Sequence, residues 1–294
     1  MREFNLCITN DFDGCDIKFI LKKHFCLSDN LITQLKKGDG ILLNGKKEFV
    51  VKKVSAGDVL KLTFSDEGSS GIIPEDISLD ILYEDDDILA VNKPGDMPTH
   101  PSLGHFGGTL ANAVMHYFRN IPFTFRAVTR LDRDTSGVVI IAKNAPAAAF
   151  ISKQFTSGTF KKEYIALCCG VPKDKRGRII APIRRVQDGI IKRCVAEDGK
   201  YAETDYELID VFGDFSLIRL FPKTGRTHQL RVHLSHIGTP IYADFLYGTD
   251  IPNERIRLHA EKISFIHPFT DKEITIYAPI PDDMTPEYIR ILKK

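Results

Sequence analysis

One stretch near the middle of the chain reads Arg130-Leu131-Asp132-Arg133-Asp134-Thr135-Ser136-Gly137 and leads directly into the apolar run Val138–Ala142. The apolar run has the length of a buried strand, and Thr135-Ser136-Gly137 supplies turn residues that can fix the loop before it. A carboxylate between two arginines is expected to stay ionised and to be oriented by charge-assisted hydrogen bonds. Local composition alone favours the alternative, in which these residues form a surface loop of salt bridges.

Strand and helix patterns follow one another irregularly around this stretch. Apolar runs predict strands at 79–83, 88–92, 138–142, 163–169, 179–183, 202–211, 215–221, 258–265 and 273–277. Helical spacing predicts helices at 109–117, 147–155 and 227–237, and a terminal helix that opens at Thr285-Pro286. Strands do not alternate regularly with helices, so the sequence predicts an α+β fold and not a doubly wound parallel sheet.

The first 64 residues predict a separate small α/β unit. Helical spacing covers 16–25, Ser28 can cap a second helix, and strands are expected at 41–43, 50–51 and 59–64 around a hairpin at Asn44-Gly45. The stretch Ser65–Gly71 has linker composition. We therefore expect a small domain over residues 1–70, a linker at about 65–75 and a larger domain over 76–294.

Composition places the chain among globular proteins and leaves its partner open. Its 294 residues are 43% hydrophobic and carry a net charge of +1. The acidic run at 84–87 is interpreted as a solvated turn and not as a metal site. No apolar run reaches the roughly 18 residues that span a bilayer, and the N-terminus shows no signal segment, so we expect a cytoplasmic protein.

Nothing in the sequence calls for a metal or a cofactor. The six cysteines form no Cys-x-x-Cys pair, and the glycine-rich run 104–108 lacks the spacing of a phosphate-binding loop. His228 and His233 are five residues apart, whereas zinc-binding pairs on a helix are spaced by four. Both histidines are therefore interpreted as structural, and neither metal nor cofactor is expected.

Two further segments have chemical character. Lys161-Lys162-Glu163-Tyr164 places a tyrosine beside two lysines, which suits stacking on a base with phosphate contacts, although a core tyrosine is the simpler alternative. The segment Lys223–His233 places several cations at the start of a predicted helix, where anions bind favourably; the alternative is a solvated basic helix.

Together these segments resemble the RluA-type family of RNA pseudouridine synthases. The family signature His-Arg-Leu-Asp-x-x-Thr-Ser-Gly is matched by residues 129–137, Lys-x-Tyr by 162–164, and Gly-Arg-x-His-Gln-Leu-Arg-x-His by 225–233. Residues 88–95, 142–144 and 258–260 also look like family stretches, and the resemblance covers roughly residues 79–280. The chain departs from the signature at Thr129, where the family has histidine. Residues of about 13–64 resemble the α-L RNA-binding module.

The resemblance implies an isomerase that converts uridine in structured RNA to pseudouridine without a cofactor. It also implies a catalytic domain with a mixed, mainly antiparallel sheet flanked by helices, preceded by the small RNA-binding domain. We expect the substrate to be large-subunit ribosomal RNA and the protein to be a monomer that does not bind membranes. Two alternatives are the same chemistry on transfer RNA, and an inactive RNA-binding or ribosome-assembly factor, which only Thr129 suggests.

The same resemblance assigns roles to individual residues. Asp132 is the essential carboxylate, Arg231 pairs with it, and Tyr164 stacks on the target base. Arg130 holds the flipped nucleotide or its phosphates, and Leu258 walls the uracil. Phosphate attraction is expected from a group of cations, namely Arg226, Lys36, Lys37, Lys46 and Lys47. Acidic neighbours also allow the lysines to be an ordinary solvated surface.

Overall fold

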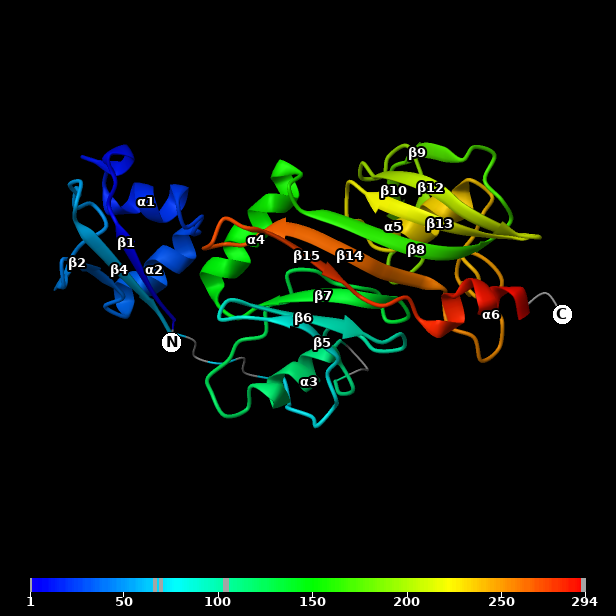
Figure 1. Ribbon diagram of the computed structural model, residues 1–294, viewed down its shortest axis with the longest axis horizontal. Helices are drawn as coiled ribbons and strands as arrows, with labels where there is room; N and C mark the ends of the chain where they lie inside the picture. The colour runs from blue at the N-terminus through cyan, green and yellow to red at the C-terminus, as the bar shows by residue number, and fades with distance from the viewer. Residues whose placement is uncertain (1, 66–67, 69–70, 103–105, 292–294) are drawn as a thin grey trace.

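The computed structural model describes residues 2–65, 68, 71–102 and 106–291, which form two units with separate sheets and cores (Figure 1). The N-terminal unit lies at one end of the molecule. Four residues of the expected linker, 66, 67, 69 and 70, fall outside the described residues. No described helix has both the length and the apolar character needed to cross a membrane.

The N-terminal unit is a four-stranded antiparallel sheet beside two helices. Its strand order is β1 (Arg2–Cys7), β4 (Val59–Phe64), β2 (Ile41–Leu43) and β3 (Lys46–Lys47), and its helices are α1 (Ile17–Lys23) and α2 (Asp29–Lys37). Ser28 caps α2, as expected, by accepting a hydrogen bond from the backbone N–H of Leu31 at 3.3 Å. The expected strand at 50–51 is wrong: these residues form a turn, closed by a bond from Lys52 N to Phe49 O.

The C-terminal unit is built on one long sheet. Its strand order is β5 (Ile81–Glu84), β6 (Ile88–Lys93), β7 (Ser136–Ala142), β14 (Leu258–Ile266), β8 (Lys161–Cys169), β13 (Phe215–Pro222), β12 (Glu203–Phe212) and β9 (Arg176–Ile180), and β15 (Glu273–Tyr277) also pairs with β14. Only β7 and β14 run parallel; the other pairs are antiparallel. The expected α+β fold with a mixed, mainly antiparallel sheet is confirmed.

Different helices cover the two faces of this sheet. Successive side chains of β6 point to opposite faces. Leu89 and Val91 pack with helices α3 (Leu110–Tyr117) and α5 (Gln229–His236) on one face. Ile88 and Ala90 pack with α4 (Ala145–Ser157) on the other face. Strands β10 (Ile183–Arg185) and β11 (Arg193–Val195) form a separate two-stranded antiparallel sheet. The last element along the chain is helix α6 (Pro286–Ile291).

Gly137 allows the parallel contact between β7 and β14. It has φ +114°, and a Cβ there would lie 2.6 Å from the backbone nitrogen of Ala260 and still closer to its carbonyl oxygen. Beside it, the Ser136 hydroxyl lies 2.9 Å from Nδ1 of His259. The Ser-Gly pair therefore joins the start of β7 to the start of β14, where the loop that carries Asp132 ends.

The two units meet through charged and aromatic contacts. Nε and Nη2 of Arg2 bind the two carboxylate oxygens of Asp87 at 3.0 and 2.9 Å, and its Nη1 binds Asp86. The rings of Phe4 and Phe269 lie 4.3 Å apart. Asp87 is 3% exposed, so the expectation that the acidic run is a solvated turn is wrong for this residue.

Candidate active site

Backbone contacts on both sides fix the loop that carries Asp132. Thr129 is buried, and its hydroxyl oxygen accepts a hydrogen bond from the backbone N–H of Ile140 at 2.9 Å. Thr99 Oγ1 donates to the carbonyl of Leu131 at 2.9 Å and accepts from its N–H at 3.3 Å. The side chain of Asp132 follows directly and remains 31% exposed. The loop thus presents the partly exposed carboxylate of Asp132 on an ordered backbone.

A buried lysine ties this loop to the preceding segment. Nζ of Lys93 donates to the carbonyl of Arg133 at 3.0 Å and to two carbonyls of its own segment, those of Pro94 at 2.7 Å and Met97 at 2.8 Å. Burial lowers the pKa of Lys93 to about 7, although the nearby Asp134 carboxylate opposes the shift. Lys93 therefore holds the loop from beneath by hydrogen bonds without being exposed itself.

Arg231 on α5 lies near Asp132, but its hydrogen bonds go to a different carboxylate, that of Asp244. Its Nη1 lies 3.8 Å from Oδ2 of Asp132, whereas Nε and Nη2 each bind Asp244 at 2.8 Å. The family resemblance implies a pairing of Arg231 with Asp132 and gives no sign of Asp244, whose side chain is fully buried. Burial would lower the pKa of Arg231, but the hydrogen bonds to Asp244 raise it. Asp244 therefore fixes the guanidinium, and the remaining nitrogen is directed at Asp132.

His228 also belongs to this site. It precedes α5 with φ +56°, its Nε2 lies 4.0 Å from Oδ2 of Asp132, and its Nδ1 lies 2.7 Å from the hydroxyl of Tyr247. The Tyr247 hydroxyl also accepts a hydrogen bond from the backbone N–H of Arg193 at 2.8 Å. Burial lowers the pKa of His228. By contrast, His233 is held by Thr204 and the carbonyl of residue 181, away from Asp132.

Tyr164 and Leu258 lie in the core beneath the site. Tyr164 is 9% exposed on β8, and Leu258 is 3% exposed on β14; both belong to one apolar cluster. Burial raises the pKa of Tyr164, and the charge of Asp132 raises it further, so its hydroxyl stays protonated. The expected roles of these two residues toward uracil remain predictions.

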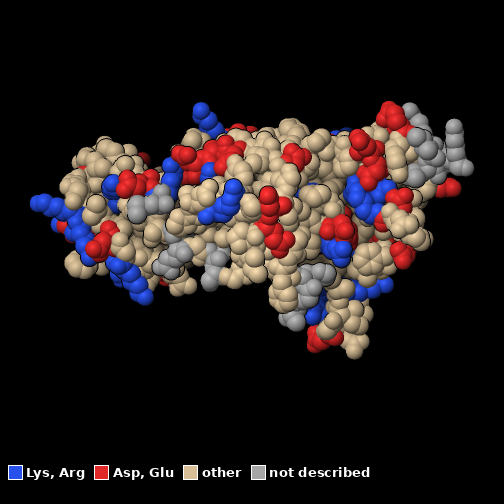
Figure 2. All heavy atoms as spheres, turned by 90° about the horizontal axis from the view of Figure 1, so that it is seen from below, with Lys and Arg blue, Asp and Glu red and all other residues tan. Residues whose placement is uncertain are grey.

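The other expected cations lie on the surface. Arg130 is exposed and has no ion-pair partner among the described residues, and Arg226 is exposed with Nε bound to the carbonyl of Tyr201 at 2.9 Å. The lysines of the N-terminal unit are exposed as well, and Lys47 pairs with Asp39. Figure 2 shows Lys and Arg side chains projecting from the N-terminal unit at one end of the molecule. The structure brings Arg231 to Asp132, whereas four of the expected cations lie on the N-terminal unit, namely Lys36, Lys37, Lys46 and Lys47.

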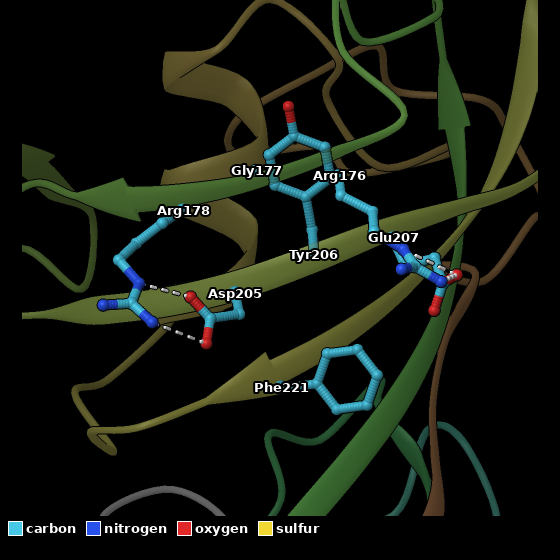
Figure 3. Close-up of a pocket in the computed structure, with 7 residues that line it drawn as sticks. All are labelled: Arg176, Gly177, Arg178, Asp205, Tyr206, Glu207 and Phe221. Carbon is cyan, nitrogen blue, oxygen red and sulfur yellow. Dashed lines mark hydrogen bonds and ion pairs between the residues drawn. The ribbon is translucent and has the colours of Figure 1, made fainter.

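A shallow hollow of about 500 Å³ lies elsewhere, on β9, β12 and β13. Figure 3 shows that its charged side chains are already paired, Arg176 with Glu207 and Arg178 with Asp205, beside the ring of Phe221. These pairs leave no free charge for a ligand, and none of the expected site residues lines the hollow.

One group of described side chains is close enough to share a metal ion: Asp85, Asp87 and His267. It lies at the junction of the two units, and its carboxylates already bind Arg2 and the hydroxyl of Tyr83. This group is therefore part of the junction and does not contribute to the site around Asp132.

Known proteins similar to this chain agree on one family. The sequence profile of the RNA pseudouridylate synthase family matches residues 87–236. The uncharacterized RNA pseudouridine synthase YjbO of Bacillus subtilis is 38% identical over 264 residues, 88% of this chain and 93% of the relative. Ribosomal large subunit pseudouridine synthase D of Vibrio parahaemolyticus is 37% identical over 267 residues, 83% of this chain and 82% of the relative. 

The solved structures agree with these relatives. Human RNA Pseudouridylate Synthase Domain Containing 1 superimposes with a TM-score of 0.60 at 30% identity, covering 72% of this chain and 86% of that chain. The motifs, the mainly antiparallel sheet and these similarities lead to one conclusion: the chain belongs to the RluA-type family of RNA pseudouridine synthases, which are isomerases.

Proposed function

We propose that this protein isomerises specific uridines of large-subunit ribosomal RNA and that Asp132 is the essential carboxylate. The observation that carries the proposal is a partly exposed carboxylate held 3.8 Å from a guanidinium whose other nitrogens are fixed by Asp244. The choice of RNA is supported by relatives named ribosomal large subunit pseudouridine synthase D, from Vibrio parahaemolyticus and Escherichia coli.

The reaction exchanges one bond of the uridine for another. The bond between the sugar C1′ and ring N1 breaks, a bond between C1′ and ring C5 forms, and the proton lost from C5 is balanced by a proton gained at N1. A carboxylate can act on such a substrate as a nucleophile or as a base. Asp132 is the carboxylate that we propose for this role, and Nε2 of His228 and Nη1 of Arg231 lie 4.0 and 3.8 Å from its Oδ2. Tyr164 is close enough to Asp132 for the carboxylate charge to raise its pKa, so we propose its protonated hydroxyl as a hydrogen-bond donor to the substrate.

RNA binding must offset the cost of extruding the target base. Unstacking a base costs a few kcal/mol, which stacking and phosphate contacts have to recover. Arg130 and Arg226 are exposed cations in the two segments that carry Asp132 and Arg231. The lysines of the N-terminal unit add attraction to phosphate that does not depend on sequence. We propose that this unit, residues 1–70, increases affinity for RNA and that the C-terminal unit carries the chemistry.

The test compares Asp132→Asn with the matched control Asp205→Asn, which changes a carboxylate on the sheet surface. Unmodified large-subunit ribosomal RNA and transfer RNA transcripts are incubated with each protein; tritium release from C5 of uridine measures turnover, and chemical mapping locates the product. We expect turnover on ribosomal RNA by wild type and Asp205→Asn, and none by Asp132→Asn, which still binds RNA.

Each other outcome removes a defined part of the proposal. Turnover by Asp132→Asn within tenfold of wild type would exclude Asp132 as the essential carboxylate. Product found only in transfer RNA would exclude ribosomal RNA as the substrate. Binding of both RNAs by wild type without any product would identify an inactive RNA-binding factor.

A further inference from the structure

An exposed aromatic side chain stands directly beside the candidate active site. Phe245 follows Asp244 in the chain and is 53% exposed, although its neighbour is fully buried. Cζ of Arg231 lies 5.6 Å from the centroid of the Phe245 ring and 5.1 Å from that of Tyr247. One side of the Phe245 ring therefore rests near the guanidinium that faces Asp132, and the remainder is open to solvent.

The turn that carries Phe245 is ordered by its own hydrogen bonds. The carboxylate of Asp244 accepts from the backbone N–H groups of Leu246 at 3.1 Å and Tyr247 at 3.2 Å, and its carbonyl accepts from Gly248 N at 2.7 Å. The same carboxylate is fixed by Arg231. Phe245 is thus held in an exposed position by an ordered turn, and its exposure does not come from a loosely attached loop.

The surroundings of this ring suit a polyanion that carries aromatic bases. Lys192 is exposed, and its Nζ lies 5.9 Å from the ring of Tyr247. Every nucleobase has a flat face that can stack on an aromatic side chain, and a cation nearby can meet the phosphate. An exposed ring beside buried and exposed cations therefore fits an unpaired nucleotide better than an apolar peptide.

We propose that Phe245 is a stacking platform for an unpaired RNA base that neighbours the target uridine. The proposal rests on the function proposed above and adds a second base to the same site. We assign the base on Phe245 to a neighbour of the target and not to the target itself, because the ring lies near the guanidinium of Arg231, with Cζ at 5.6 Å, and Asp132 lies at the Nη1 of that guanidinium. Phe245 thus contributes to the choice of uridine by binding the base next to that uridine in the RNA.

The experiment separates stacking from a purely structural cover over Arg231. Phe245→Leu keeps an apolar side chain next to the guanidinium but removes the flat ring, and Phe245→Trp keeps a ring. Tyr277→Leu is the control, because Tyr277 is a 59% exposed aromatic on β15. KM and the rate at saturating RNA are measured on the large-subunit ribosomal RNA transcript, with turnover followed by tritium release.

We expect Phe245→Leu to raise KM roughly tenfold, the size expected for one lost base stack, with the saturating rate within about twofold of wild type. Phe245→Trp and Tyr277→Leu should match wild type. After the target uridine is mapped, oligonucleotides with an abasic residue on either side of it provide a second readout. One of the two should weaken binding to wild type but not to Phe245→Leu.

Three results would overturn the inference. An unchanged KM for Phe245→Leu excludes stacking, and a lower saturating rate that Phe245→Trp does not restore shows a structural cover instead. If the wild-type protein makes no pseudouridine, the proposed function fails and the inference fails with it. If the wild-type protein is active and Phe245→Leu has the same KM and rate, only the inference fails.

Discussion

Replacing Asp244 by asparagine removes the charge that fixes Arg231. The carboxylate accepts two hydrogen bonds from the guanidinium and two from backbone N–H groups, all inside the protein. An amide of the same shape offers one acceptor oxygen and has no charge. Arg231, whose side chain is 3% exposed, then has Asp132 at 3.8 Å as its nearest carboxylate among the described residues.

The structure sets the expected size of the effect. Breaking a buried ion pair by removing one partner costs about 3–5 kcal/mol of unfolding free energy, because the other charge stays buried without compensation. Asp205→Asn is the matched control: Asp205 also binds an arginine, Arg178, but their side chains are 25% and 57% exposed. An exposed pair contributes about 0–1 kcal/mol, so the control should be nearly neutral.

Urea unfolding of both variants measures these free energies, and tritium release measures turnover. We expect Asp244→Asn to lose stability and also turnover, since Arg231 is no longer directed at Asp132. The double variant Arg231→Leu/Asp244→Asn removes both charges, while the amide oxygen can still accept from the backbone N–H groups of Leu246 and Tyr247. It should therefore be more stable than Asp244→Asn alone without recovering turnover. Equal, small stability losses for Asp244→Asn and Asp205→Asn would refute the assignment of Asp244 as the partner that fixes Arg231.

Three other substitutions test the loop that carries Asp132. Gly137→Ala should lose about 2–6 kcal/mol in urea unfolding, because its Cβ would overlap Ala260 at a positive φ; a loss below about 1 kcal/mol would contradict the close contact. Burial lowers the pKa of Lys93 from 10.5 to about 7, so between these pH values the unfolded chain binds more protons than the folded protein. The stability of wild type relative to Lys93→Met should therefore rise as the pH increases from 7 to 10, and a difference independent of pH would be inconsistent with this shift. Thr129→Val should cost about 1–3 kcal/mol by leaving the buried N–H of Ile140 without an acceptor, whereas Thr129→Ser should keep most of the stability; equal melting temperatures for the two variants would argue against the hydrogen bond.

Local patterns predicted most elements of the fold, and the missing ones depend on distant partners. The start of one helix was predicted from Ser28, and the start of another, at residue 109, from helical spacing. The side chains of Ser28 and Thr109 each accept a hydrogen bond from the backbone N–H three residues later. Strand β1 was missed because its sequence alternates only weakly, and its pairing partner, β4, begins at Val59. The run Val50-Val51 favours a strand by composition but forms a turn, so a short apolar run alone does not determine a strand.

For the candidate site too, residues in sequence motifs were predicted, whereas residues that reach the site through tertiary contacts were not. Sequence motifs identified Asp132 and Arg231, and the structure places them 3.8 Å apart. They did not identify Asp244, because its contact with Arg231 is tertiary and follows no helical or strand spacing. His228 was interpreted as structural on the ground of zinc-ligand spacing, which does not test proximity to a carboxylate. A buried carboxylate followed by an ordered turn becomes recognisable only once the fold is known.

The contacts between Arg2 and Asp87 and between Phe4 and Phe269 give the two units a defined separation. Under the proposed function, the lysines and Asp132 then act on one RNA at two points whose spacing the protein sets in advance. A folded RNA satisfies both points only if a phosphate-rich segment and an extrudable uridine lie at that same spacing. Under the same proposal, the junction selects RNA substrates by their dimensions, before any base is recognised.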